Sequence, residues 1–182
     1  MSLGADRAGA AGTTPSGRTP PGRVDEAARR ARYADGLAQL LAVLEDETDP
    51  VARMATACSL LREQLPQASF AGFYRALGED LLVIGPYQGP LACLRVPFGR
   101  GVCGAAAREG RSVLVPDVRA FPGHIACDAR SRSELVLPVR DATGRLVAVC
   151  DLDSHEPGAF DELDQQELER WMDRLLRVPA AD

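Results

Sequence analysis

Apolar residues recur at intervals of three and four positions in three segments of the chain, and this spacing predicts amphipathic helices. The first segment follows Val24. The second begins at Asp49, whose side chain can cap a helix that has Pro50 at its first position. The third lies near the C-terminus. The apolar stripes consist of Leu37, Leu40, Leu41 and Leu44 in the first helix, Val51, Met54, Cys58 and Leu61 in the second, and Leu168, Trp171, Met172, Leu175 and Leu176 in the third.

Short runs of aromatic and branched residues, separated by turn sequences, predict strands between the second and third of these helices. A further short helix is expected from Gly101 to Gly110, because glycine is well suited to end a helix. A polar loop is expected over residues 117–132. This order of elements predicts an α+β fold in which helices pack on an antiparallel sheet of about six strands. The expected strands are residues 70–74, 81–87 and 91–98, which form a meander, residues 112–117, and residues 134–139 and 145–153, which form a hairpin around DATG.

The chain is predicted to contain one folded domain preceded by a tail. Residues 1–22 are rich in Gly, Ala, Pro, Thr and Arg and have almost no large apolar side chain, so we expect them to be disordered. Residues 23–178 carry the periodic pattern and form the predicted domain. The 182 residues are 46% hydrophobic, which is enough to build one core.

Charge and hydropathy exclude several classes of function. The formal net charge is −5 and the chain contains no lysine, so a nucleic-acid-binding face is not expected. No apolar stretch approaches the roughly 20 residues that span a bilayer, and the N-terminus does not resemble a secretory signal. We therefore expect a cytoplasmic protein.

Five cysteines, an odd number, do not suggest a structural disulfide framework in that compartment. Their spacing contains no close pair such as C-x₂-C, so a metal site is not expected. Cys58 belongs to a helical apolar stripe and is interpreted as a core residue. Cys127 is different, because it lies among Asp128, Arg130 and Arg132 in a segment too polar for a core, a setting that suits a thiolate.

Three segments carry a resemblance to a known family. They are GPYQGPLACLRVPFGRGVCGAAA, VPDVRAFPGHIACDARSRSELVLPV and GRLVAVCDLDS, which contain Cys93, Cys103 and Cys127 within long runs. Over roughly residues 69–165, the chain resembles the GAF-domain enzymes called free methionine-(R)-sulfoxide reductases. The resemblance implies a GAF-like fold, a homodimer, and thiol-dependent reduction of free methionine-(R)-sulfoxide without a bound cofactor. It also implies recycling by thioredoxin, with glutaredoxin or glutathione as substitutes.

The chemistry of sulfoxide reduction needs a thiolate that attacks sulfur and a second thiol that condenses with the resulting sulfenic acid. Cys127 fits the nucleophile, and His124 and the nearby arginines could favour its anionic form. Cys93 and Cys103 are both candidates for the second thiol. The resemblance favours Cys93, whereas Cys103 could be an additional resolving thiol or, in the rival assignment, the first to attack.

Carboxylates near the hairpin are candidates for substrate binding. Asp151 and Asp153 lie on one face of the last strand by the period-two rule, with Cys150 on the other face among core residues. Such a pair could keep one carboxyl protonated as a donor to the sulfoxide oxygen, or bind the substrate ammonium as an anion. Without the resemblance, solvated strand-end carboxylates are the better interpretation of both. The resemblance adds Glu134 to the same acidic pocket.

Two aromatic residues complete the candidate pocket. Phe70 and Tyr74 are four residues apart in a strand and therefore lie on one face, a pattern that by itself is more typical of a core. The resemblance aligns them with an aromatic pair that surrounds substrate, where the first residue is usually tryptophan. Phe70 keeps an apolar wall but has no indole N–H to donate.

A second class of function also agrees with these features. A non-catalytic GAF sensor could bind a small ligand, or register oxidants by forming a disulfide between the same cysteines. The two classes differ in turnover, because only an enzyme consumes reductant when the sulfoxide is added.

Overall fold

The computed structural model describes residues 25–177, and the predicted tail over residues 1–22 lies outside them. The fold is α+β, with helices packed on a six-stranded antiparallel sheet, as the sequence predicted. The strands are β1 (Phe70–Leu77), β2 (Leu81–Gln88), β3 (Arg95–Pro97), β4 (Val113–Val115), β5 (Ser133–Arg140) and β6 (Leu146–Ser154). The helices are α1 (Glu26–Val43), α2 (Pro50–Gln64), α3 (Gly101–Glu109), the 3-10 turn η1 (Val118–Ala120) and α4 (Glu162–Leu175).

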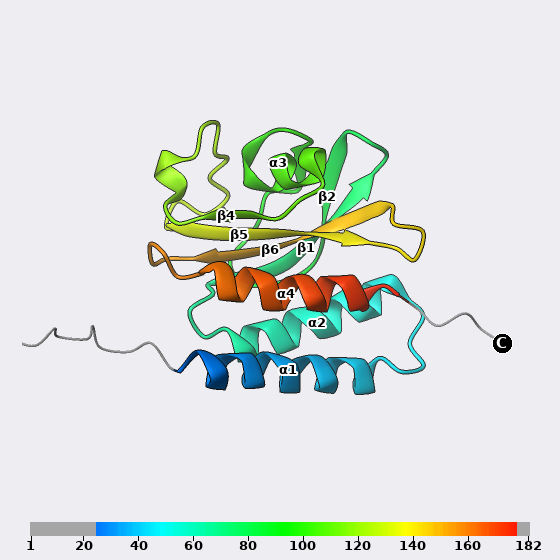
Figure 1. Ribbon diagram of the computed structural model, residues 1–182. Helices are drawn as coiled ribbons and strands as arrows, with labels where there is room; N and C mark the ends of the chain where they lie inside the picture. Colours follow the sequence, from blue (N-terminus) through cyan, green and yellow to red (C-terminus); the bar gives the residue numbers. More distant parts are fainter. Residues whose placement is uncertain (1–24, 178–182) are drawn as a thin grey trace, which may run out of the picture.

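The sheet is the middle layer of the molecule (Figure 1). Its strand order is β3-β2-β1-β6-β5-β4, so the first and last long strands of the chain, β1 and β6, pair at its centre. On one face α2 and α4 pack on the sheet, and α1 lies across them as an outer layer. The opposite face carries α3 and the loop between β4 and β5. No helix within residues 25–177 is long and apolar enough to cross a membrane.

The helical face of the sheet contains the larger hydrophobic core. It joins residues from all three helices on that side to alternate residues of the central strands, including Trp171, Leu61 and Phe73, each at most 1% exposed. Cys58 and Cys150 belong to this core, as their positions in the apolar patterns indicated. The expectation that residues 168, 171, 172, 175 and 176 face inward is confirmed, because all five are buried.

The predicted stripe of the second helix is wrong at one position. Asp49 caps α2 and Pro50 begins it, as expected, but Val51 is 45% exposed. The buried position in the first turn is instead occupied by Arg53, which is 2% exposed. Its guanidinium donates to the main-chain oxygens of Leu44 and Glu47 after α1 and to that of Leu175 in α4. Helical spacing alone could not distinguish the two faces of this first turn, because the decisive partners belong to other helices.

The third predicted strand is also shorter than expected. Of residues 91–98 only Arg95–Pro97 pair with β2, and the segment before them leaves the sheet edge with Leu91 84% and Leu94 72% exposed. The departure places Cys93 against the loop over β5, where it is bonded to Cys127. Nothing in the local pattern records that long-range link, so the apolar run LACL was interpreted as strand.

Candidate active site

Three neighbouring strands supply the floor of a pocket on the α3 face of the sheet. In β6, Asp153 pairs with Phe70 of β1 on one side and with Glu134 of β5 on the other. Asp151 lies two residues earlier in β6 and therefore on the same face, opposite Gly72. A Cβ at Gly72 would lie 2.7 Å from the Phe70 ring, so glycine leaves room there for the aromatic wall. Seven of the eight residues predicted for the site line this pocket. The eighth, Cys93, is bonded to Cys127, which is one of the seven.

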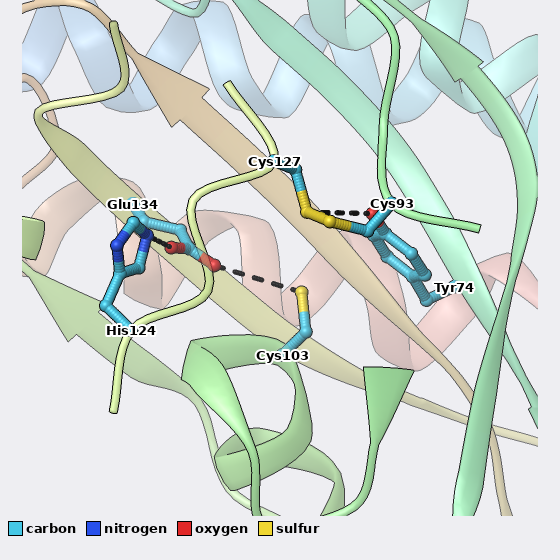
Figure 2. The surroundings of a disulfide bond; sticks show 6 residues. All are labelled: Tyr74, Cys93, Cys103, His124, Cys127 and Glu134. Carbon is cyan, nitrogen blue, oxygen red and sulfur yellow. Dashed lines mark hydrogen bonds and ion pairs between the residues drawn. A yellow bond between two sulfur atoms is a disulfide. The ribbon is translucent and has the colours of Figure 1, made fainter. Parts of the chain in front are cut away.

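Cys93 and Cys127 form a disulfide at the mouth of the pocket (Figure 2). Their Cα atoms are 5.2 Å apart, and the bond links the segment before β3 to the loop between β4 and β5. The Tyr74 hydroxyl lies 4.0 Å from Cys127 Sγ, within range of a weak hydrogen bond to sulfur. Burial raises the pKa of Tyr74, which keeps its hydroxyl protonated. A neutral hydroxyl therefore lies beside one sulfur of the disulfide.

Cys103 is a third sulfur at the same pocket, in the first turn of α3. It is a free thiol, 6% exposed, and its Sγ lies 3.8 Å from Glu134 Oε1. Burial, followed by the charge of Asp151, raises the pKa of this thiol well above its usual value. Cys103 is thus a protonated thiol at neutral pH in the disulfide form of the protein.

Burial shifts the pKa of all three carboxyl groups at the floor of the pocket. Burial raises the pKa of Glu134 and of Asp151 well above their usual values, and the charge of Asp153 raises both further. Burial raises the pKa of Asp153 to about 6, against a hydrogen bond from Ser131 that lowers it. Carboxyl groups that stay protonated near neutral pH can donate a hydrogen bond or a proton to a bound oxygen.

The charged residues around Cys127 are arranged differently from the sequence-based expectation. Arg130 pairs with Asp128 at 3.0 Å and Arg132 pairs with Asp117 at 3.1 Å, so both guanidinium groups are directed to carboxylates rather than to sulfur. His124 Nε2 lies 3.6 Å from Glu134 Oε2, over the acidic floor (Figure 2). Sequence proximity to Cys127 did not predict these partners.

Two polar residues at the pocket were missed from the sequence. Ser131 is 7% exposed and hydrogen-bonded to Asp153, and Asp128 is held by Arg130 and by His155 Nε2 at 3.1 Å. Both lie in the polar loop, where serine and aspartate are common in turns and give no separate signal. His155, just past β6, is exposed, and its contact with Asp128 anchors this loop to the end of that strand.

Comparison with known proteins identifies the fold family. A GAF-domain profile matches residues 47–174. The chain belongs to the GAF-domain family. It is 52% identical over 145 residues to Protein YtsP of Bacillus subtilis, covering 79% of this chain and 88% of that one. It is also 43% identical over 148 residues to the free methionine-R-sulfoxide reductase of Escherichia coli, covering 81% and 88%.

A solved structure agrees with this assignment. The chain superposes on the free methionine-R-sulfoxide reductase of Neisseria meningitidis in complex with its substrate, with a TM-score of 0.77 and 44% identity. The match covers 81% of this chain and 87% of that one. The resemblance to this group of GAF-domain enzymes, and the GAF-like fold that it implied, are therefore confirmed.

Proposed function

We propose that this GAF-domain protein reduces free L-methionine-(R)-S-oxide to methionine with its own thiols. The observation that carries the proposal is the Cys93–Cys127 disulfide beside a pocket lined by three carboxyl groups. Relatives named free methionine-R-sulfoxide reductase, 43% identical to this chain, support the same conclusion. The disulfide then corresponds to the product state of the enzyme after one turnover.

The pocket offers complementary groups for a small oxidised amino acid. Phe70 and Tyr74 form an apolar wall suited to the side-chain methylenes and the methyl group. A protonated carboxyl among Glu134, Asp151 and Asp153 can donate to the sulfoxide oxygen, whereas an ionised one can bind the ammonium. The pKa of Asp153 is raised only to about 6, and a hydrogen bond from Ser131 favours its ionised form, so Asp153 is the candidate for the ammonium.

The reaction begins in the reduced enzyme. The Cys127 thiolate attacks the substrate sulfur and forms an S–S bond while a carboxyl group protonates the oxygen. The resulting hydroxyl group then moves to Cys127 Sγ as the substrate S–O bond and the new S–S bond break. Methionine leaves and Cys127 becomes a sulfenic acid. The Cys93 thiol then attacks that sulfur and water departs, which closes the disulfide. In sum one sulfoxide and two thiols give one thioether, one disulfide and one water.

Cys103 has two roles open to it in this scheme. It can act as an additional resolving or relay thiol, or it can attack first and pass the oxidation to the other pair. Its deep position beside Glu134 and its raised pKa favour a protonated thiol in the oxidised state, and therefore favour Cys127 as the first nucleophile.

Regeneration requires an external dithiol, and thioredoxin is the reductant proposed here, as the family resemblance implied. Two protons and two electrons from it convert the disulfide to the thiols of Cys93 and Cys127. We further propose that residues 23–178 form the whole catalytic unit, that it works in the cytoplasm, and that it is a homodimer.

A coupled assay tests the activity. The protein is incubated with thioredoxin, thioredoxin reductase and NADPH, and NADPH consumption is followed after adding each sulfoxide epimer, free or peptide-bound. Turnover with the free R epimer alone is expected. A sensor that only forms the disulfide would consume one equivalent of reductant and stop, and that outcome would reject the proposal.

Variants assign the sulfurs. Cys127→Ser is expected to abolish turnover, whereas Cys58→Ser, a thiol in the helical core on the far side of the sheet, should retain it. Near-normal turnover by Cys127→Ser would transfer the nucleophilic role to Cys103. Asp151→Asn and Asp153→Asn are expected to slow the reaction while the protein remains folded.

A further inference from the structure

Three buried donors from three different elements converge at the floor of the pocket. They are the thiol of Cys103 in α3, the carboxyl group of Glu134 in β5 and that of Asp151 in β6. One ligand atom from each lies within 4.8 Å of the other two, and all three residues are buried. A thiolate and two carboxylates in such proximity form a set of ligands that borderline-soft divalent cations accept.

An orphaned oxygen is a second and separate observation. Asp151 is 5% exposed, and its Oδ1 has no hydrogen-bond partner within residues 25–177. A buried carboxyl oxygen without a partner costs free energy, and such a group in a pocket points to a ligand that would satisfy it. Asp151 lines the same pocket as Cys103 and Glu134, so the unpartnered oxygen belongs to a residue of the converging set.

We infer that Cys103, Glu134 and Asp151 bind a Zn²⁺-like divalent cation at the floor of the pocket. The separation between Cys103 Sγ and Glu134 Oε1 is 3.8 Å. Two tetrahedral zinc ligands of these types would be about 3.5 Å apart, given usual metal–ligand distances. Small side-chain movements therefore suffice. Three protein ligands leave a fourth position open toward the pocket, where water would complete the shell.

Occupation of this site has a consequence beyond the proposed reductase activity. The bound cation would hold Cys103 as a thiolate and Glu134 and Asp151 as carboxylates, and the protons that these three groups lose would pass to solvent. The cation would therefore exclude a small substrate from the floor of the pocket. Cys93 and Cys127 are joined in the oxidised protein, so Cys103 is the free thiol among the residues that line the pocket there. Binding by the oxidised form can thus be measured without turnover.

Cobalt(II) is the probe of choice, because it occupies zinc sites and thiolate ligation gives it an intense near-ultraviolet absorption band. The full-length oxidised protein, freed of metal with a chelator, is titrated with Co²⁺. One equivalent is expected to bind with a thiolate-to-cobalt band, and Zn²⁺ should displace it. Absence of the band at saturating Co²⁺ would overturn the inference.

Variants and a chemical probe locate the ion. Cys103→Ser is expected to abolish the band, and Glu134→Gln and Asp151→Asn to weaken binding by about tenfold or more. The matched controls are Cys58→Ala, a buried thiol on the far face, and Asp128→Asn, a pocket carboxylate already held by Arg130; both should bind as the wild type does. A band that survives Cys103→Ser, or disappears in Cys58→Ala, would reject the site.

A measurement on the unaltered protein removes dependence on the folding of variants. Zn²⁺ should slow alkylation of Cys103 in the oxidised protein, as mapped by mass spectrometry of the labelled peptides. Equal rates with and without Zn²⁺ would contradict the inference. Because neither measurement involves sulfoxide, a failure here leaves the reductase proposal intact, and a failure of the coupled assay leaves the metal site intact.

Discussion

Asp153 illustrates how a single side chain can be placed for function at the expense of stability. Its pKa rises from the ordinary 3.8 to about 6 because the folded protein buries it. The folded state therefore binds more protons than the unfolded state between about pH 4 and pH 6, and stability falls as the pH rises through that range. Above about pH 6 the full cost is present, on the order of 2–3 kcal/mol for a shift of this size.

Asp153→Asn should therefore raise the free energy of unfolding at pH 7, by up to about 3 kcal/mol, while impairing reduction. At pH 4 the variant and the wild type should be alike, because the carboxyl is then protonated in the folded state. Urea unfolding at both pH values measures the effect. Asp117→Asn is the control, and it should lower the free energy of unfolding at pH 7. A hydrogen bond from the Arg119 main chain lowers the pKa of Asp117, so the ionised carboxylate stabilises the folded state. A loss of stability in Asp153→Asn at pH 7 would contradict the argument.

Arg53 is a buried charged residue that should stabilise the fold, because its guanidinium donates hydrogen bonds to main-chain oxygens. The guanidinium donates to the main-chain oxygens of Leu175 at 2.6 Å and Leu44 at 2.9 Å, and so satisfies carbonyl groups where α4 and α1 end. Arg53→Met should destabilise the protein by roughly 2–4 kcal/mol, since those oxygens would be left buried without donors.

The matched control for Arg53 lies on the same helix. Arg62 is partly buried, and its Nη1 has no hydrogen-bond partner within residues 25–177. Arg62→Met should change the free energy of unfolding much less than Arg53→Met in the same urea titration. Equal losses would show that Arg53 acts through its aliphatic stem rather than through the carbonyl groups.

At the level of elements, α3 is positioned by a close approach that only glycine allows. Gly104 follows Cys103 in the first turn of the helix, and a Cβ there would collide with the main-chain oxygen of Pro97. The same turn is tied by a hydrogen bond of 2.6 Å from Gly99 N to Gly104 O. The contact fixes how near the first turn of α3, and with it the Cys103 thiol, comes to the sheet.

Gly104→Ala has two opposing effects, and their sizes decide the outcome. Alanine favours a helix interior over glycine by about 1 kcal/mol. Overpacking against a rigid main-chain oxygen costs about 1–3 kcal/mol. We therefore expect net destabilisation in urea, together with a change in the alkylation rate of Cys103 as its helix is displaced. If the variant is more stable and Cys103 is alkylated at an unchanged rate, the main chain at Pro97 moves to accommodate the methyl group at little cost.

The elements that the sequence predicted well are those with a long periodic pattern. The C-terminal apolar stripe and the cap at Asp49 both predicted helices correctly, because apolar spacing and capping depend on residues close together in the sequence. Residues 91–94 were misjudged, since they lie off the sheet edge, where Cys93 is bonded to Cys127 of a distant segment. For the site, period two placed Asp151 and Asp153 on one face, whereas the approach of Cys103 to Glu134 depends on how α3 packs, which no local pattern encodes.

For the whole molecule, the sheet separates the cysteines of the helical core from those at the pocket. Cys58 and Cys150 lie in the core beneath α2 and α4, and burial raises the pKa of Cys58 to about 12. The face with α3 carries the disulfide and Cys103. We therefore expect that reduction of the disulfide leaves the helical core in place, because neither of its sulfurs belongs to that core.

The disulfide should nevertheless change the stability of the whole domain. Cys93 and Cys127 are separated by 34 residues, and closing a loop of that length in the unfolded chain is worth about 3–4 kcal/mol in the chain-entropy account. The oxidised protein should unfold at a higher urea concentration than the protein kept in excess dithiol. Cys93→Ser cannot form the bond and should show the same midpoint under both conditions, which separates the cross-link from other effects of the reductant. If wild type and Cys93→Ser respond equally to dithiol, the cross-link does not stabilise the fold, and the bond is offset by strain or by lost contacts in the loops that it joins.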